Sequence, residues 1–310
     1  MKTHQRTLTG DNDLRAMEAL AREFRADHLH VTDLPYRLST STLDDPESVR
    51  LWFDDGGRLL AWIVLQIPFD SLDFVVHPEV EADLLPQMLA WADERSRAHP
   101  GMIPLGTPED KPCWFVNVFA DRPARLRILE AAGFADQGDV GEYSWSKVWL
   151  MRPGDLPVKD YRIPPGFVVR PLAGEGEVEA YVALHRAVFG STIMNADWRR
   201  RTLRHPDHVP DLDLVVAAPD GRLAAFCVCW LDARGPEAIG QIEPLGCHKD
   251  FRHLALGRIA LAEGLRRLHA HGATKVFVET DNWRSTAKSL YESLGFQVVR
   301  DVRVYRKDYS

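Results

Sequence analysis

The sequence predicts an α/β protein built from two successive copies of one architecture. Two observations carry this prediction. The C-terminal half reads as strands that alternate with helices, and its landmarks recur in the same order in the N-terminal half. A chain of 310 residues is also long enough for two domains.

The run from Gln241 to Ile259 is the most informative segment. Gln241–Cys247 reads as a strand, a short turn rich in His, Lys and Arg follows, and a helix is expected to begin near Leu256. The first N–H groups of a helix have no partner within it, and the helix dipole adds partial positive charge there. A helix start flanked by Arg252 and Arg258 is therefore suited to a pyrophosphate.

The segments that follow continue the alternation. Lys275–Thr280 is a short apolar strand, and Gln297–Arg306 is expected to be the last strand. Between them, Gly295 is typical of a helix end. One helical face in front of it is predicted from the spacing of Ala287, Leu290, Tyr291 and Leu294.

Three landmarks in the N-terminal half match landmarks in the C-terminal half. They are separated by 162 to 171 residues and pair Arg58 with Arg222, His77 with His248, and Gly133–Phe134 with Gly295–Phe296. Because the order and the spacing both agree, the sequence predicts an internal duplication.

A stretch rich in proline and glycine separates the two copies. Proline removes a backbone donor and disfavours helix before it, so residues 151–165 are expected to form an extended linker between domains 1–150 and 166–310. The second domain is predicted to open with a strand at Gly166–Arg170. Helices are predicted near Glu175–Phe189 and Asp197–Leu203.

The turn before the helix at Leu256 resembles the acetyl-CoA-binding signature of the GNAT acetyltransferases. That signature is Arg or Gln, two residues, Gly, one residue, then Gly or Ala, and it matches Arg252, Ala255 and Gly257. The family usually has Gly where this chain has Ala255. If the position needs positive φ, Ala costs about 1 kcal/mol, whereas a need for a small side chain is met by Ala.

The resemblance implies two tandem GNAT domains, each a mixed, mostly antiparallel sheet with helices on both faces. In that family a central strand splays from its neighbour, and the pantetheine arm of CoA lies in the gap. The implied cofactor-binding residues are Leu245, Gly246 and Cys247 along the arm, then Arg252, His253, Leu254, Ala255, Leu256, Gly257 and Arg258 around the pyrophosphate, with Asn282 beyond them.

The resemblance also implies catalytic roles. Tyr291 holds the place of the family's tyrosine, which can protonate the leaving thiolate, and Glu243 holds the place of a glutamate that serves as general base. His248 is a second candidate base because its ordinary pKa is near neutrality. Water alone is the third possibility.

The N-terminal copy departs from this pattern. Its helix start carries Glu79, Glu81 and Asp83, and Leu129 stands opposite Tyr291. Two like charges 4 Å apart at an effective dielectric of 20 repel by ~4 kcal/mol, so these carboxylates disfavour a diphosphate. We expect this copy to be degenerate, with a structural or substrate-shaping role. The whole arrangement is similar to that of tandem GNAT proteins such as the mycothiol synthases, from which we carry over no substrate.

Composition narrows the remaining possibilities. A net charge of -7 argues against general nucleic-acid binding, and no apolar stretch is long enough for a membrane span. The four cysteines have no metal-ligand spacing, so free thiols, no metal and a cytoplasmic location are expected. We expect a monomer or a homodimer.

The sequence therefore predicts an N-acetyltransferase that uses acetyl-CoA as acyl donor and a small-molecule primary amine as acceptor, by direct attack in a ternary complex. A non-catalytic acyl-CoA binder or sensor is the alternative, and a scaffold that binds no CoA is a third possibility. The sequence does not identify the amine, because one fold serves many acceptors.

Overall fold

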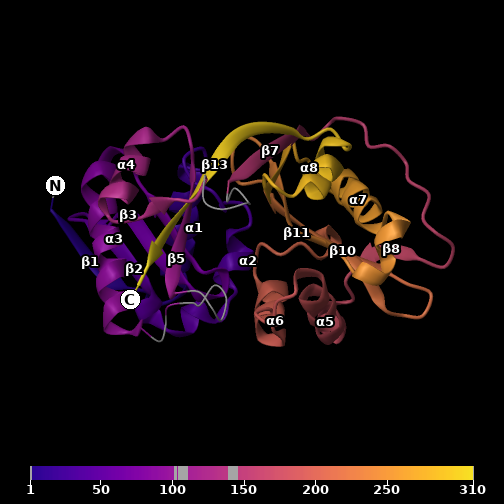
Figure 1. Ribbon diagram of the computed structural model, residues 1–310, viewed down its shortest axis with the longest axis horizontal. Coiled ribbons are helices and arrows are strands. Elements are labelled where there is room, and N and C mark those ends of the chain that lie inside the picture. Colours follow the sequence, from indigo (N-terminus) through magenta and orange to yellow (C-terminus); the bar gives the residue numbers. More distant parts are fainter. Residues whose placement is uncertain (1, 101–102, 104–110, 139–145, 310) are drawn as a thin grey trace.

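The computed structural model describes residues 2–100, 103, 111–138 and 146–309. Two α/β lobes lie side by side along the long axis of the molecule, and both chain ends lie at the N-terminal lobe (Figure 1). We call the elements from β1 to β6 the N-terminal lobe and those from β7 to β12, with α8, the C-terminal lobe. The last strand spans both.

The N-terminal lobe holds four α-helices and six strands among its described residues. They are β1 (Thr3–Thr7), α1 (Asp11–Glu23), α2 (Leu34–Leu38), β2 (Val49–Asp54), β3 (Leu59–Gln66), β4 (Ser71–Val76), α3 (Glu81–Ala98), β5 (Cys113–Phe119), α4 (Pro123–Ala131) and β6 (Ala135–Asp136). Two short 3-10 turns matter for the site, η3 (Ile67–Phe69) and η4 (Pro78–Val80).

The C-terminal lobe repeats the order of the N-terminal lobe. Its elements are β7 (Lys147–Pro153), β8 (Val168–Pro171), α5 (Val178–Phe189), α6 (Ala196–Arg204), β9 (Asp213–Ala217), β10 (Leu223–Asp232), β11 (Ile239–Cys247), η8 (Lys249–Leu254), α7 (Leu256–Ala270), β12 (Lys275–Asp281) and α8 (Ser285–Glu292), followed by β13 (Gln297–Asp308). Each strand and helix that the sequence predicts here is present, with ends shifted by a few residues.

One continuous mixed sheet runs through both lobes. Among the described residues its order is β1-β2-β3-β4-β5-β13-β7-β12-β11-β10-β9-β8, with β6 paired to β13. The first part of β13 pairs with β7, Gln297 opposite Met151, and the second part pairs with β5, Val304 opposite Asn117. The twelve-residue β13 is therefore the strand that joins the lobes.

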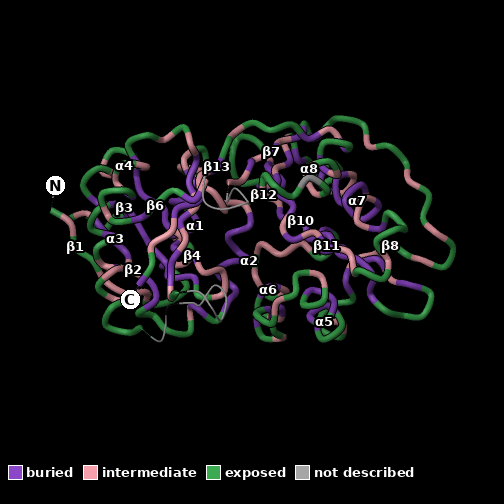
Figure 2. The backbone as a smooth tube through the Cα atoms, in the orientation of Figure 1, coloured by how far each residue is buried: buried purple, intermediate pink, exposed green. Residues whose placement is uncertain are grey.

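This continuity differs from the expectation of two separate sheets. Strand β7 comes before the linker in sequence, yet it pairs with β12 of the C-terminal lobe along its whole length. It also reaches Pro153, three residues into the stretch expected to be linker. Alternation of apolar residues identifies a strand but not its neighbour, so the exchange was not visible in the sequence. The exposed remainder of the linker runs along the outside of the C-terminal lobe (Figures 1 and 2).

Helices cover both faces of the sheet in each lobe, as expected. In the N-terminal lobe α1 packs on one face and α3 with α4 on the other. In the C-terminal lobe α5 and α6 pack on one face, and α7 with α8 on the other. Figure 2 shows the buried residues concentrated in the strands and on the inner sides of these helices.

The landmarks that predicted the duplication occupy equivalent positions. His77 and His248 each cap the 3-10 turn after the equivalent strands β4 and β11, and each accepts a hydrogen bond from the N–H two residues on. The N–H of Phe134 bonds Leu129 O at 3.0 Å, and the N–H of Phe296 bonds Tyr291 O at 3.2 Å. Leu129 is thus the structural counterpart of Tyr291.

Within the described part of the chain, no helix combines the length and the apolar composition that a membrane crossing requires.

Candidate active site

The central strands of the C-terminal lobe diverge and leave a gap. The parallel strands β11 and β12 pair only where Ile239–Gln241 faces Lys275–Phe277, although both strands continue further. Cys227 and Cys229 of β10 face Leu245 and Ile242 of β11, so β11 carries one extra residue within Glu243–Pro244. Such a bulge bends the strand, and Pro244 has no N–H to pair.

The backbone of β11 is held in this bent course by its neighbours. The indole N–H of Trp230 donates to Glu243 O at 2.8 Å. A Cβ on Gly246 would lie 2.5 Å from the Phe226 ring and 2.6 Å from Val188, so only glycine fits. Leu245, Gly246 and Cys247 therefore present their main chain along the gap, where an extended ligand can take the place of the missing strand.

The gap leads to the start of α7. Ala255 has φ 56 and ψ 22, so the position that is Gly in the family signature does adopt the left-handed conformation. The first N–H groups of α7 have no partner within the helix, and a Cβ at Gly257 would meet only Cys247, at 3.8 Å. The residues around this open helix start fit a phosphate group, and they are Arg252, His253, Leu254, Ala255, Leu256, Gly257 and Arg258.

A cavity of about 850 Å³ lies beside the gap, between the two lobes. This volume is within the range of small-molecule sites. The C-terminal lobe contributes Phe189, Glu243, Pro244, Leu245, Glu279, Thr280, Asp281, Trp283, Arg284, Ala287 and Tyr291, with Lys147 of β7; the N-terminal lobe contributes His30, Arg37, Phe69, Asp70, Ser71, Phe115 and Asn117.

Glu243 and Tyr291, the two predicted catalytic residues, meet at this cavity. Burial, with the nearby carboxylates Asp33 and Glu279, raises the pKa of Glu243 to about 7. Its carboxylate makes no hydrogen bond or ion pair with the described residues, so a proton acceptor poised near neutrality faces the cavity. Burial also raises the pKa of Tyr291, which keeps the phenol protonated.

A charged network with members from both lobes lines the cavity around this pair, and sequence reasoning missed it. Lys147 Nζ lies 2.7 Å from Glu279 Oε1, and His30 lies 3.1 Å from Asp33 Oδ2 and 3.7 Å from Glu279 Oε2. Arg37 is held by Asp73 and Ser71. These residues come from separate turns and strands with no common spacing, so only the packing of the lobes brings them together.

Of the predicted site residues, Glu243, Leu245 and Tyr291 line the cavity, whereas Gly246, Cys247 and the loop 252–258 lie outside its lining, as do His248 and Asn282. His248 is used as a cap, since its Nδ1 accepts the N–H of Asp250 at 3.3 Å. Asn282 is exposed, and its side-chain amide donates to Ser146 Oγ at 3.3 Å. Of the two candidate bases, Glu243 is thus the one that faces the cavity.

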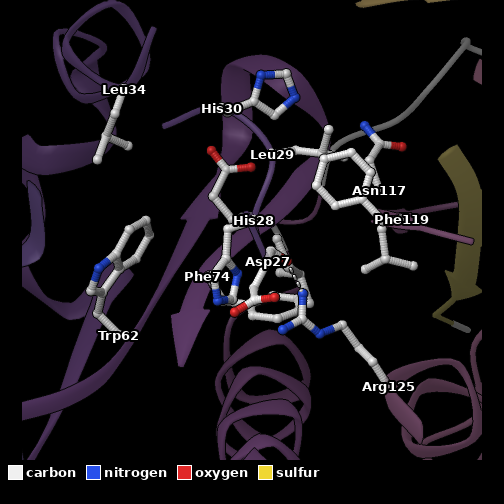
Figure 3. Close-up of a pocket in the computed structure, with 13 residues that line it drawn as sticks. Asp27, His28, Leu29, His30, Leu34, Trp62, Phe74, Asn117, Phe119 and Arg125 are labelled. Carbon is white, nitrogen blue, oxygen red and sulfur yellow. Dashed lines mark hydrogen bonds between the residues drawn. The ribbon is translucent and has the colours of Figure 1, made fainter. Parts of the chain in front are cut away.

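The corresponding gap of the N-terminal lobe is filled by the chain itself. Strands β4 and β5 pair only at Ser71 and Phe115 before they diverge. His28 lies in that gap with Nε2 3.2 Å from Val76 O (Figure 3). The remaining cavity is about 30 Å³, roughly the room of a water molecule.

The helix start of this lobe is also occupied. Glu81, one of the carboxylates that the sequence placed there, forms an ion pair with Arg125. Arg125 Nη1 in turn donates to Asp27 O at 2.6 Å. The Glu81–Arg125 pair and the filled gap leave no room for a pantetheine arm in this conformation.

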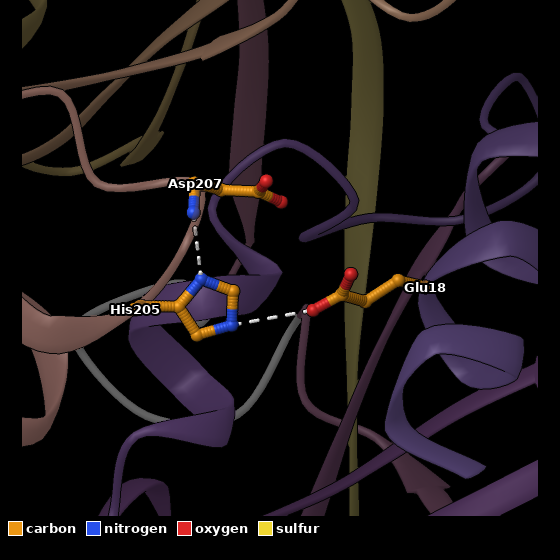
Figure 4. A group of neighbouring side chains, drawn as sticks. All are labelled: Glu18, His205 and Asp207. Carbon is orange, nitrogen blue, oxygen red and sulfur yellow. Dashed lines mark hydrogen bonds and ion pairs between the residues drawn. The ribbon is translucent and has the colours of Figure 1, made fainter. Parts of the chain in front are cut away.

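Among the residues that the structure describes, one side-chain group has the spacing of metal ligands, and its members already have partners within the protein. The ligand atoms of Glu18, His205 and Asp207 lie within 4.8 Å of one another. His205 faces Glu18 through Nε2 at 3.3 Å and accepts the Asp207 N–H through Nδ1 (Figure 4). Asp207 is also paired with Arg234 at 2.6 Å. We therefore describe this group as a contact between the lobes.

The fold and the site together define an α/β protein with a gap between two diverging parallel strands that leads to a helix start. Residues 178–296 match the Acetyltransferase (GNAT) family. The C-terminal lobe is therefore a domain of the GNAT family.

Curated relatives are similar over part of the chain. A mycothiol acetyltransferase of Thermobispora bispora is 29% identical over 183 residues, which are 57% of this chain and 59% of the relative. A mycothiol acetyltransferase of Thermomonospora curvata is 29% identical over 145 residues, 46% of this chain and 48% of the relative. The matched part is thus about half of each relative's length.

Solved structures share the fold of the whole chain. A tandem GNAT protein from the clavulanic acid biosynthesis pathway superposes with a TM-score of 0.69 at 15% identity, covering 99% of this chain and 98% of its own. A GCN5-related N-acetyltransferase from Sphaerobacter thermophilus gives 0.64 at 15% identity, covering 99% and 95%. This chain has the tandem GNAT fold.

Proposed function

We propose that this protein is an N-acetyltransferase that transfers an acetyl group from acetyl-CoA to a primary amine. The observation that carries the proposal is the meeting of Glu243 and Tyr291 at one cavity beside the strand gap. The family match and the names of the curated relatives support acetyl transfer as the reaction class. The N-terminal lobe, in this proposal, shapes the acceptor side of the cavity and binds no CoA.

The donor lies along the gap. Main-chain groups of Leu245–Cys247 bond the pantetheine arm, and the helix start from Arg252 to Arg258 holds the pyrophosphate. This places the thioester near the mouth of the cavity, between Glu243 and Tyr291.

The transfer is direct. Glu243 takes a proton from the acceptor ammonium, through water or directly, and the neutral amine attacks the thioester carbonyl. As the tetrahedral intermediate collapses, the C–S bond breaks and an amide forms. Tyr291 donates its phenolic proton to the departing thiolate, and the second proton of the attacking nitrogen restores the Tyr291 phenol. Glu243 releases its proton to solvent, so the products are the N-acetylated amine, the free thiol of CoA and one proton.

One observation favours a second candidate, a non-catalytic acyl-CoA binder. Ala255 holds a left-handed conformation that costs a non-glycine residue about 1 kcal/mol. A binder need not have the loop geometry of an active enzyme. The protonated Tyr291 and the unpaired Glu243 favour the enzyme.

Replacement of Tyr291 by Phe tests the enzyme. We expect Tyr291→Phe to lower kcat by at least about 10-fold, with acetyl-CoA affinity changed far less, because only the proton donor is removed. Release of CoA thiol with a panel of primary amines gives the rate, and calorimetry gives the affinity. Tyr305→Phe is the matched control, since its hydroxyl bonds Glu130 in the N-terminal lobe. Equal kcat in wild type and Tyr291→Phe removes Tyr291 from the acid role.

A further inference from the structure

Four carboxylates line the cavity, and two of them are paired with a basic side chain while the other two are not. Glu279 is paired with Lys147 at 2.7 Å, and Asp281 with Arg284 at 2.7 Å. Glu243 and Asp70 make no ion pair or side-chain hydrogen bond with any described residue. Glu243 comes from the C-terminal lobe and Asp70 from the N-terminal lobe, so the two lobes each place one unpaired carboxylate at the same cavity.

Asp70 is held at the cavity by its backbone. It follows η3 in a left-handed conformation, with φ 52, and its carbonyl accepts the N–H of Phe115 at 2.8 Å. Its side chain is half-buried, and this burial raises its pKa to about 6. Removing a carboxylate from water without giving it a partner costs free energy, which is why buried carboxylates are usually paired. A cationic ligand group at this cavity would supply the counter-charge that Asp70 lacks.

A second acceptor points to the same kind of ligand. The Glu279 side chain is only 7% exposed, and its Oε2 has no hydrogen bond. Its nearest cation is His30 Nε2, at 3.7 Å, beyond hydrogen-bond reach. Glu279 therefore adds one buried acceptor atom without a hydrogen bond to the two unpaired carboxylates of the cavity.

Part of the wall is aromatic or aliphatic. Phe69, Phe115, Phe189, Trp283 and Ala287 line the same cavity. Phe189 is 42% exposed and Trp283 is 51% exposed, so aromatic surface is open to a ligand. Alkyl chains and ammonium groups both bind such rings favourably.

We propose that the acceptor is a diamine. One of its amino groups loses a proton to Glu243 and is acetylated, while the other remains an ammonium group and pairs with Asp70. This inference rests on the proposed acetyltransferase function, and it names Asp70 as a specificity-determining residue. The alkyl chain between the two nitrogen atoms lies against the aromatic wall. Only one C–N amide bond forms, and the second ammonium group leaves unchanged with the product.

Binding tests the inference without turnover. The CoA-saturated protein is titrated by calorimetry with two diamines, 1,4-diaminobutane and 1,5-diaminopentane. The matched compounds are 4-aminobutan-1-ol and 5-aminopentan-1-ol, in which a neutral hydroxyl replaces one ammonium group. We expect at least one diamine to bind about 10-fold more tightly than its amino alcohol. Asp70→Asn should remove this preference, whereas Asp55→Asn, an exposed site in a distant turn, should keep it.

A turnover arm separates this inference from the proposed function. Release of CoA thiol should show a higher kcat/KM for the preferred diamine than for its amino alcohol, and Asp70→Asn should remove that difference by lowering kcat/KM more for the diamine than for the amino alcohol. Diamine binding that depends on Asp70 without any acetylation contradicts the transferase and keeps the cation site. Equal binding of diamines and amino alcohols, no diamine binding, or an equal loss for both in Asp70→Asn overturns the inference. Thermal unfolding of each variant checks that it is folded.

Discussion

Glu243 illustrates how one residue at the cavity can favour catalysis and lower the stability of the folded protein. Glu243 is buried without a counter-charge, and burial moves its pKa from 4.5 to about 7. A base whose pKa is near the working pH is efficient because it is partly ionised and still basic. The same shift means that the folded protein binds this proton more tightly than the unfolded chain does.

Glu243→Gln should therefore change activity and stability in opposite directions. We expect kcat to fall by about 10²–10⁴, the usual contribution of a general base, and wild-type activity to rise with pH through about 7. Because the folded pKa is raised, wild-type stability falls as pH rises from 4.5 towards 7. Thermal unfolding should show Glu243→Gln more stable by about 1–3 kcal/mol at pH 8 and unchanged near pH 4.

The exposed Glu292→Gln on α8 is the matched control, and neither property should change in it. Full activity of Glu243→Gln with good amine substrates would move the role of base to water.

Ala255 gives a second prediction for a single residue. Its φ of 56 is a conformation that glycine adopts without the steric cost of a Cβ. Ala255→Gly should stabilise the protein by about 1 kcal/mol and leave acetyl-CoA binding intact, as chemical denaturation and calorimetry can measure. Ala183→Gly, on the exposed side of α5, should have the opposite sign because glycine weakens a helix interior. Destabilisation by Ala255→Gly would contradict the left-handed assignment.

Elements of secondary structure create the proposed donor site, because the contacts proposed for CoA come mainly from main-chain groups of β11 and of the start of α7. The pairing of β11 with β12 ends before the bulge at Glu243–Pro244. The turn η8 then connects β11 to the start of α7. In the N-terminal lobe the equivalent strands also diverge, yet His28 and the Glu81–Arg125 pair fill the equivalent space. The same topology thus gives one open gap and one closed gap.

This difference predicts one acetyl-CoA per chain, bound in the C-terminal lobe. Gly257→Glu should abolish binding, because a carboxylate at the helix start repels the pyrophosphate. Gly176→Glu is the matched control, since a side chain there meets nothing within 4 Å and lies far along the chain from the loop. Calorimetry gives both stoichiometry and affinity. Two sites per chain would show that the N-terminal gap opens.

The whole molecule is tied together by the exchanged strands. β13 completes the sheet of the N-terminal lobe beside β5, while β7 lies between β13 and β12. Further contacts join the lobes, among them the Trp198 indole N–H to Tyr36 O at 2.9 Å and Arg201 to Asp44 at 2.7 Å. Neither lobe has a complete sheet without strands from the other half of the sequence.

We therefore expect the two lobes to unfold together. Scanning calorimetry of the full chain should give one transition, and a chain ended after Val302 should unfold at a lower temperature, because β5 loses its partners from Arg303 to Asp308. Truncation should also weaken amine acceptance, since Phe115 and Asn117 beside that strand line the cavity. Two separate transitions, assignable to residues 1–150 and 166–310, would instead support independent domains.

Short sequence patterns were enough to predict the strands and helices and the cavity residues Glu243 and Tyr291, but not the residues that the N-terminal lobe contributes to the cavity. The strand, turn and helix around Gln241–Ile259 are set by residues adjacent in sequence. The matching landmarks of the two copies are also short sequence patterns. The placement of Glu243 and Tyr291 at one cavity agrees with the sequence prediction of paired acid and base. The roles of these two residues and of the cofactor loop remain predictions until they are measured.

The sequence by itself determined the strands and helices, the duplication, the family signature and the residues of the donor loop, because each is encoded in local spacing or in short motifs. The tertiary structure alone decided that β7 and β13 exchange between lobes, that His28 closes the N-terminal gap, and that Asp70 faces the cavity with Glu243. Those features depend on which surfaces pack together, and residues distant in sequence carry no local sign of the neighbour they will have.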